Sequence, residues 1–357
     1  MRILLVTDER GTPEIQGGGM SYMMSVLRPA IKLGHEVECI TAEDYRNPYD
    51  GRALKEHLTK TVSEFDPDIV NVFNNCIWGF DIFRELDRMG VPSVLSSPDY
   101  SIICKTRMLL KNLERICDGP SKDCDGCPNL RIGVGKDEDI KKDMLDRRII
   151  VISEFMRRKL IEVGYESENV EMIEVGIRPE SYKPLFDVES GEVLNITRIA
   201  FEKGIHHYFE LAQMVPELKW SLAGYPNVRF EKEGVDYLGE LSEKDKLYRL
   251  RHSEMFVSTP RWHEPAGLTY LEAKACGKPI ISFRLGGIPQ YHEGIGSILL
   301  DYCDLNGMAE AVRRLHADKD LRIRLGKEGR KQIEERNNEN ILIHKTISVY
   351  DKVRGVK

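Results

Sequence analysis

The chain has 357 residues, of which 31% are charged, and its formal net charge is -6 at pH 7. This length exceeds one typical hydrophobic core, so two domains are expected. The slightly acidic balance excludes a protein whose whole surface is built to bind nucleic acid. No apolar run is long enough to span a membrane, and the first, at residues 1–7, is too short for a signal-peptide core. We therefore expect a cytoplasmic protein, in which Cys residues are more often thiols or metal ligands than disulfides.

The first half of the chain alternates strand-like and helical segments. Strand-like runs at 3–7, 36–41, 69–73 and 92–95 are separated by helical stretches, and those at 69–73 and 92–95 are mostly apolar. Such runs are typical of parallel strands covered on both faces, so this half is predicted to be Rossmann-like. The turn after the first run carries consecutive glycines but lacks the third glycine of the dinucleotide-binding fingerprint, which counts against a dehydrogenase.

The alternation breaks between residues 99 and 147, where we expect an insertion. Four of the eight Cys lie close together in its polar part, at Cys104, Cys117, Cys124 and Cys127. We expect them to converge on one structural metal ion, most readily zinc, because four thiolates satisfy its tetrahedral coordination and would order a segment with a small core. Disulfides, unliganded thiols and an iron–sulfur cluster stay open as alternatives.

Residues 105–116 of this insertion interleave cationic and apolar side chains in the pattern of an amphipathic helix. The cations are Lys105, Arg107, Lys111 and Arg115. Such a helix either packs on its own domain or contacts an anionic acceptor or the lipid headgroups at the inner face of a membrane.

A second alternating series follows a polar linker that ends near residue 185. Strands or strand ends are expected at 193–199, 220–224, 235–239, 255–259, 279–283 and 298–300. The fold class is therefore predicted to be α/β, with two Rossmann-like, doubly wound parallel sheets. The expected domains are 1–185, which includes the insertion, and 186–336, followed by a terminal helix at 337–357.

The stretch 259–279 is predicted to hold a strand end, a polar loop, a helix and a glycine stop. Pro265 biases Glu264 toward an extended backbone, and Gly277 ends the helix that begins near residue 266. The first N–H groups of this helix have no partners within it and form an anion site. They belong to Gly267, Leu268 and Thr269. Glu264 at the rim and Glu272 on the second turn suit a polyhydroxyl ligand that bears phosphates.

The frame Glu-Pro-x-Gly-Leu-x-x-x-Glu-Ala-x-Ala-Cys-Gly-x-Pro around Glu264 and Glu272 resembles the retaining glycosyltransferases of family 4, group 1 enzymes of GT-B fold. By this resemblance, Glu264 contacts hydroxyls of the donor sugar and Glu272 contacts the nucleotide ribose. Arg198 and Lys203 resemble the family's Arg-x4-Lys pair, and their charges would stabilise the leaving diphosphate.

The resemblance extends to weaker motifs. Gly18 and Gly19 are similar to the family's glycine loop, which faces the donor diphosphate and the acceptor. Leu238 lies at the turn where the family holds the base, mostly through backbone groups. The terminal helix would cross back to the first domain, as it does in GT-B proteins. Ala266 departs from the family pattern, because an aromatic residue usually follows the Glu-Pro pair.

The resemblance implies a metal-independent hexosyltransferase that needs no cofactor for catalysis. Its donor would be a UDP-, GDP- or ADP-sugar bound in a cleft between the two domains, and its acceptor a glycan, a lipid-linked sugar or a small molecule, as in cell-surface polysaccharide biosynthesis. Fold does not fix reaction, so four alternatives stay open. They are a sugar-nucleotide epimerase, a sugar phosphorylase, a catalytically silent nucleotide-sugar binding module and a metal-dependent interaction protein that uses the Cys insertion.

Overall fold

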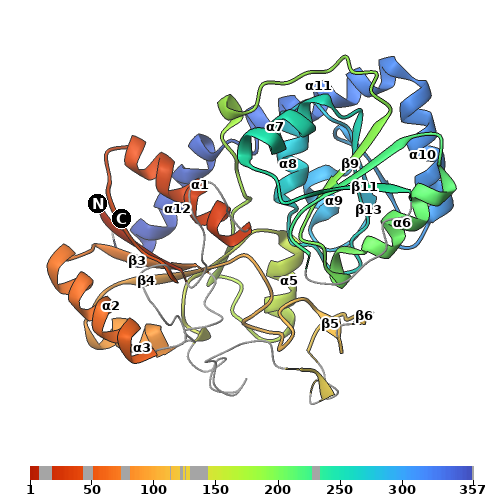
Figure 1. Ribbon diagram of the computed structural model, residues 1–357. Helices are drawn as coiled ribbons and strands as arrows, with labels where there is room; N and C mark the ends of the chain where they lie inside the picture. The colour runs from red at the N-terminus through yellow and green to blue at the C-terminus, as the bar shows by residue number, and fades with distance from the viewer. Residues whose placement is uncertain are drawn as a thin grey trace. The chain divides into compact units, whose positions relative to one another are not determined.

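The computed structural model describes residues 1–7, 18–42, 51–73, 81–112, 114–120, 124, 126–128, 144–226 and 234–355. The chain divides into two compact units, shown in Figure 1. The first unit comprises Met1–Asn112, Cys117–Gly176 and Glu339–Lys357, and the second comprises Leu113–Ile116 and Ile177–Asn338. Each unit contains one six-stranded sheet.

The sheet of the first unit is parallel throughout and has the order β2-β1-β3-β4-β7-β8. Its strands are β1 (Arg2–Thr7), β2 (Glu36–Ile40), β3 (Ile69–Phe73), β4 (Ser93–Ser97), β7 (Ile149–Val151) and β8 (Val170–Met172). Every residue of β3 is buried, because both neighbouring strands and helices cover it. This double coverage explains why the strand has no polar alternation.

The helices that the structure describes in the first unit are α1 (Gly18–Lys32), α2 (Gly51–Phe65), α3 (Asp81–Arg88), α5 (Glu154–Glu162) and α12 (Glu339–Val353). The last of them, α12, returns to this unit and packs beside α1 (Figure 1). The guanidinium of Arg28 donates to both carboxylate oxygens of the buried Glu339, at 3.2 and 2.7 Å. Asn71 in β3 donates to the hydroxyl of Tyr350 at 2.7 Å, so α12 is joined to the centre of the sheet.

Residues 105–116 do not form the predicted amphipathic helix. Apart from residue 113, which lies outside the described residues, the segment consists of the two-residue strands β5 (Leu110–Lys111) and β6 (Arg115–Ile116) and of turns and irregular backbone. Arg107, Leu109 and Asn112 have φ values of 66°, 50° and 51°, which a right-handed helix cannot contain. Leu109 and Leu110 are buried, so the apolar side chains follow an irregular backbone into the fold. These residues therefore do not form the predicted helix that could lie on a membrane surface.

The sheet of the second unit is also parallel, in the order β11-β10-β9-β12-β13-β14. Its strands are β9 (Glu192–Ile196), β10 (Lys219–Ala223), β11 (Val235–Gly239), β12 (Met255–Ser258), β13 (Ile280–Phe283) and β14 (Ser297–Leu300). Register is fixed at the centre, where Phe256 of β12 aligns with Leu194 of β9 and Ile280 of β13. The two predicted Rossmann-like parallel sheets are thus confirmed.

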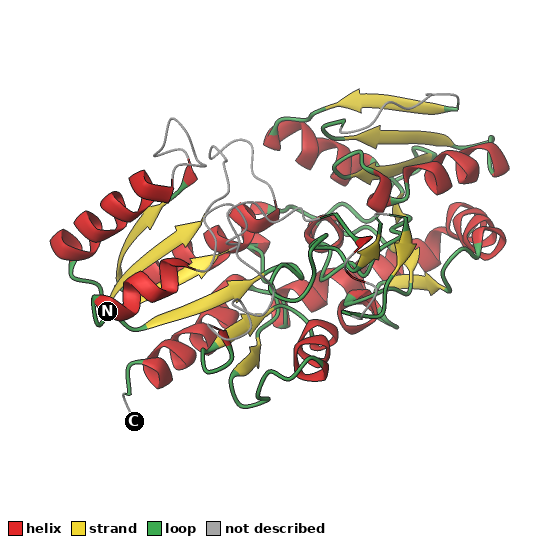
Figure 2. Ribbon diagram, turned by 90° about the horizontal axis from the view of Figure 1, so that it is seen from below, coloured by secondary structure: helices red, strands yellow, loops and turns green. Residues whose placement is uncertain are grey.

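The helical elements of the second unit follow its strands in turn. They are η3 (Pro179–Ser181), η4 (Phe201–Lys203), α6 (Ile205–Met214), α7 (Glu243–His252), α8 (Leu268–Ala275), α9 (Ile288–His292), α10 (Leu305–Ala317) and α11 (Lys319–Glu335). Two separate apolar clusters pack on the strands, one containing Tyr208 and Trp220 and the other Phe256 and Tyr270. Figure 2 separates the strands from these helices by colour. No helix within the described ranges is long and apolar enough to cross a bilayer.

Candidate functional site

The turn after β9 is pressed against the end of β12. Gly204 closes this turn with φ +66°, and a Cβ on it would lie 1.7 Å from the carbonyl oxygen of Thr259. The Thr259 hydroxyl donates to the Gly204 carbonyl at 2.8 Å. Only glycine permits both the left-handed backbone and this close approach. Lys203, the residue before it, is therefore held beside the loop that follows Thr259.

Lys203 and Glu264 meet directly, although they are 61 residues apart in sequence. The Lys203 ammonium donates to Glu264 Oε2 at 2.6 Å, and the indole N–H of Trp262 donates to the same oxygen at 2.9 Å. The ammonium also lies 4.7 Å from the centre of the Trp262 ring, within the range of a cation–π contact. Glu264 is only 9% exposed, so its charge is compensated by groups that the fold brings to it.

A glycine pair supports the backbone of Glu264. The N–H of Gly287 donates to the Glu264 carbonyl at 2.8 Å. Gly286 has φ +62°, and a Cβ on it would lie 2.6 Å from the carbonyl carbon of His263 and 2.7 Å from the Glu264 carbonyl oxygen. This loop follows β13, the neighbour of β12 in the sheet. Two adjacent strand ends thus fix the position of one carboxylate.

Helix α8 begins at Leu268, two residues later than the sequence pattern predicted. Gly267 occupies the N-cap in the left-handed region, with φ +78° and ψ +73°, and no side chain caps the helix. Within the described ranges, the N–H groups of Gly267, Leu268 and Thr269 donate to no other group. Their partial positive charge suits an anion.

Glu272, on the second turn of α8, is held by two side chains from outside the motif. The hydroxyl of Tyr182 donates to Glu272 Oε1 at 3.0 Å, and the ammonium of Lys246 donates to the same oxygen at 2.8 Å. Burial, and then the charge of Glu272, raises the pKa of Tyr182 well above its usual range, so the phenol stays a donor. Neither Tyr182 nor Lys246 could be found from sequence, because the fold alone brings them to α8.

The remaining predicted donor residues of the second unit are more exposed. Arg198 pairs with Glu202, which is buried, while half of the Arg198 side chain stays exposed. Leu238 lies in β11, is partly buried and packs against the cluster that contains Phe256. The structure therefore joins Lys203 to Glu264 but gives Arg198 a different acidic partner.

The predicted glycine loop belongs to the first unit. Gly18 and Gly19 open α1, with Gly18 exposed and Gly19 buried. The preceding glycine, Gly17, lies outside the described residues. Both described glycines follow the carboxyl end of β1, which is the edge where open α/β sheets bind ligands.

The four cysteines of the insertion are half-buried, and none of them is in a disulfide. The Cys117 thiol donates to the Gly119 carbonyl at 3.1 Å. Burial raises the pKa of Cys117, and the negative charges of the other three thiolates raise it further. Among the residues the structure describes, no group of three or more His, Cys, Asp or Glu is placed to hold a metal ion. The zinc site stays a prediction, and it requires these thiols to come closer together.

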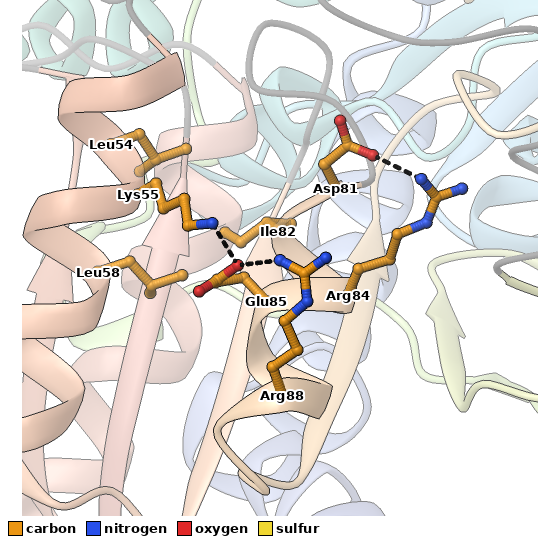
Figure 3. A pocket seen from close by; sticks show the side chains of 8 residues that line it. All are labelled: Leu54, Lys55, Leu58, Asp81, Ile82, Arg84, Glu85 and Arg88. Carbon is orange, nitrogen blue, oxygen red and sulfur yellow. Dashed lines mark hydrogen bonds and ion pairs between the residues drawn. The ribbon is translucent and has the colours of Figure 1, made fainter.

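A cavity of about 390 Å³ lies between α2 and α3 (Figure 3). Its cationic side chains already have carboxylate partners: Glu85 pairs with Lys55 at 2.9 Å and Arg88 at 3.0 Å, and Asp81 pairs with Arg84 at 3.3 Å. No residue predicted from sequence to bind a donor lines this cavity, so we assign it no role in the site.

Part of the chain matches a known protein family. Residues 178–332 match the model of the family described as glycosyl transferases group 1. The putative glycosyltransferase YtcC of Bacillus subtilis is 22% identical over 92% of this chain and 86% of its own length.

Solved structures extend the likeness to the whole chain. Sucrose-phosphate synthase from Thermosynechococcus elongatus superposes with a TM-score of 0.79 at 15% identity, covering 100% of both chains. Anabaena HepE, solved in complex with UDP-glucose, gives a TM-score of 0.73 at 16% identity, covering 98% of this chain and 99% of its own. The predicted GT-B fold is thereby confirmed. The family match itself covers residues 178–332, less than half of the chain, and the solved structures show the fold.

Proposed function

We propose that this chain is a retaining, metal-independent glycosyltransferase of family 4 that transfers a hexose from a nucleotide-diphosphate sugar. The observation that carries the proposal is the contact of 2.6 Å between Lys203 and Glu264. It lies at the carboxyl ends of the adjacent strands β9 and β12, the edge at which open parallel sheets bind ligands. The uncapped N-terminus of α8 follows in the same loop.

Each part of the site has a role in this reaction. Glu264 accepts hydrogen bonds from hydroxyls of the transferred sugar, and Glu272 accepts them from the ribose. The amides of residues 267–269 bind the diphosphate, and backbone groups at Leu238 hold the base. Gly18 and Gly19 let the backbone approach the diphosphate and the acceptor closely.

Charge stabilisation is the main catalytic contribution in this scheme. As the bond between the anomeric carbon and the diphosphate oxygen breaks, negative charge develops on the diphosphate. Lys203 and Arg198 stabilise that charge. The acceptor hydroxyl attacks the anomeric carbon from the face on which the diphosphate departs, so the anomeric configuration is unchanged. The hydroxyl gives its proton to the departing phosphate oxygen. The acceptor is a hydroxyl of a glycan, a lipid-linked sugar or a small molecule.

Two relatives of the fold support the class of donor. HepE was solved with UDP-glucose and with UDP. The structure of sucrose-phosphate synthase superposes on this chain over the whole length of both. A diphosphate-bearing donor also matches the charge arrangement of Lys203, Arg198 and the α8 amides.

The proposal is tested by a panel of UDP-, GDP- and ADP-sugars. Thermal shift first identifies the nucleotide, because a ligand that binds the folded state raises its stability by RT ln(1 + [L]/Kd). The donor that binds is then supplied with a labelled hexose and a mixture of acceptors. Transfer of label to an acceptor supports the proposal. Epimerised sugar, phosphorolysis, or binding without turnover would identify one of the alternative activities instead.

A further inference from the structure

The two acidic residues of the motif are each held through a single oxygen. Glu264 accepts both of its hydrogen bonds, from Lys203 and Trp262, on Oε2. Glu272 likewise accepts from Tyr182 and Lys246 on Oε1. Within the described part of the chain, Glu264 Oε1 and Glu272 Oε2 accept no hydrogen bond. One oxygen of each carboxylate therefore keeps its capacity to accept from a ligand.

We propose that Trp262 is a positioning residue for the donor sugar, and this inference rests on the function proposed above. Its indole N–H fixes the Glu264 carboxylate so that Oε1 is presented to a sugar hydroxyl. A Lys side chain has several rotatable bonds and binds as a point charge, so Lys203 alone does not define the plane of the carboxylate. The indole is rigid and 8% exposed, and it supplies a donor of fixed direction.

The same ring also restrains the cation. Lys203 Nζ lies 4.7 Å from the Trp262 ring centre while it contacts Glu264. Trp262, Lys203 and Glu264 thus form a closed triangle in which the aromatic residue touches both charged groups. The Trp262 carbonyl additionally accepts the N–H of Glu264 at 2.8 Å, which fixes the turn between them.

A second buried tryptophan shows what a purely structural role looks like in this unit. The N–H of Trp220 donates to the Val215 carbonyl at 2.9 Å, and its ring packs against Tyr208 in the apolar core. Trp220 therefore satisfies its polar atom with backbone, as buried tryptophans commonly do, whereas Trp262 uses a carboxylate of the candidate site.

The test replaces the indole with rings that cannot donate. Trp262→Phe keeps an aromatic face under Lys203 and removes the N–H. We expect kcat/KM for the nucleotide sugar to fall about 10- to 100-fold, as for loss of a hydrogen bond to a charged group. The Kd of the nucleoside diphosphate alone, which has no sugar, should change less than about twofold, and this binding also shows that the variant is folded. Trp220→Phe is the matched control. It should lower the melting temperature, but it should not lower kcat/KM selectively while the Kd of the nucleoside diphosphate stays unchanged.

A double-mutant cycle with Glu264→Gln identifies the route of the effect. If Trp262 acts through the Glu264 carboxylate, Trp262→Phe should cost little further in the Glu264→Gln background. Equal losses in both backgrounds, or full kcat/KM in Trp262→Phe, would overturn the inference. Full kcat/KM in Glu264→Gln alone would instead overturn the role proposed for Glu264.

A second variant serves if Trp262→Phe does not fold. Incorporating 3-benzothienylalanine at position 262 puts sulfur in place of the indole N–H and preserves the bicyclic shape. The same fall in kcat/KM is expected, with nucleoside diphosphate binding retained. A variant of this kind with unchanged kcat/KM would refute the positioning role without any question of packing.

Discussion

Replacing Lys203 with Ala tests the central contact of the site. The ammonium is 2.6 Å from Glu264 Oε2, and the two side chains are 19% and 12% exposed. A hydrogen bond to a charged group contributes about 1.5–3 kcal/mol to the free energy of unfolding. In Lys203→Ala, the Trp262 N–H remains as a donor to the Glu264 carboxylate. We therefore expect the free energy of unfolding of this unit to fall by about 1.5 kcal/mol, near the lower end of that range.

The effect on turnover should be larger than the effect on stability. Because negative charge grows on the diphosphate as the glycosidic bond breaks, a cation there stabilises the transition state more than the ground state. By analogy with an oxyanion donor, its loss costs about 2.7–4 kcal/mol, or 10²–10³ in kcat. Initial rates with the donor found in the nucleotide-sugar panel give kcat and KM separately, and thermal denaturation gives the change in stability.

The exposed Lys244 of α7 supplies a control for removing one positive charge from the same unit. Lys244→Ala should leave both kcat and the melting temperature unchanged, because no ion pair involves it in the described structure. If Lys203→Ala keeps its kcat and raises only KM, the ammonium binds the ground state and the transition state equally, and the catalytic role assigned to it is wrong.

Three further predictions concern backbone support, a buried charge and the cysteines. Gly286→Ala should lose more stability and turnover than Gly294→Ala, because both glycines have positive φ but only Gly286 would place a Cβ against the Glu264 backbone; denaturation and rate assays compare them. Burial, and then the charge of Arg336, lowers the pKa of Lys274 to about 7. Its folded pKa is below its unfolded value, so the native state binds fewer protons and the free energy of unfolding should rise between pH 7 and 9, by about 2 kcal/mol. The dependence of the free energy of unfolding on pH should be weaker in Lys274→Met. An equal dependence in both proteins would show that Lys274 is not the group responsible. Protein purified anaerobically without chelator should carry about one equivalent of zinc, whereas less than about a tenth of an equivalent, with all four thiols titratable, would exclude the site formed by Cys104, Cys117, Cys124 and Cys127.

The sequence correctly indicated features that depend on local periodicity. The mostly apolar run 69–73 predicted a strand covered on both faces, and β3 is buried at every position, including Asn71. The glycine and proline after α8 marked its end, because neither residue type continues a helix easily. Local signals of this kind were sufficient for two parallel sheets and for the residue types of the candidate site.

Periodicity failed in the cysteine-containing insertion. The alternation of cationic and apolar side chains at 105–116 fitted a helix, yet Arg107, Leu109 and Asn112 take positive φ. Side-chain pattern reports which residues are buried, whereas the backbone here follows turns between short strands. Tertiary packing therefore overrode the local preference.

By itself, the sequence determined the order of the strands and helices and the chemical groups available at Lys203, Glu264 and Glu272. Tertiary structure decided which groups meet. The sequence does not indicate which group the Trp262 indole contacts. In the fold, the turn at Gly204 brings Lys203 to the same oxygen of Glu264 that the indole N–H contacts. Tyr182 reaches Glu272 across 90 residues. Contacts of this range arise because parallel strands gather their carboxyl ends at one edge, and no local pattern encodes which side chains then face each other.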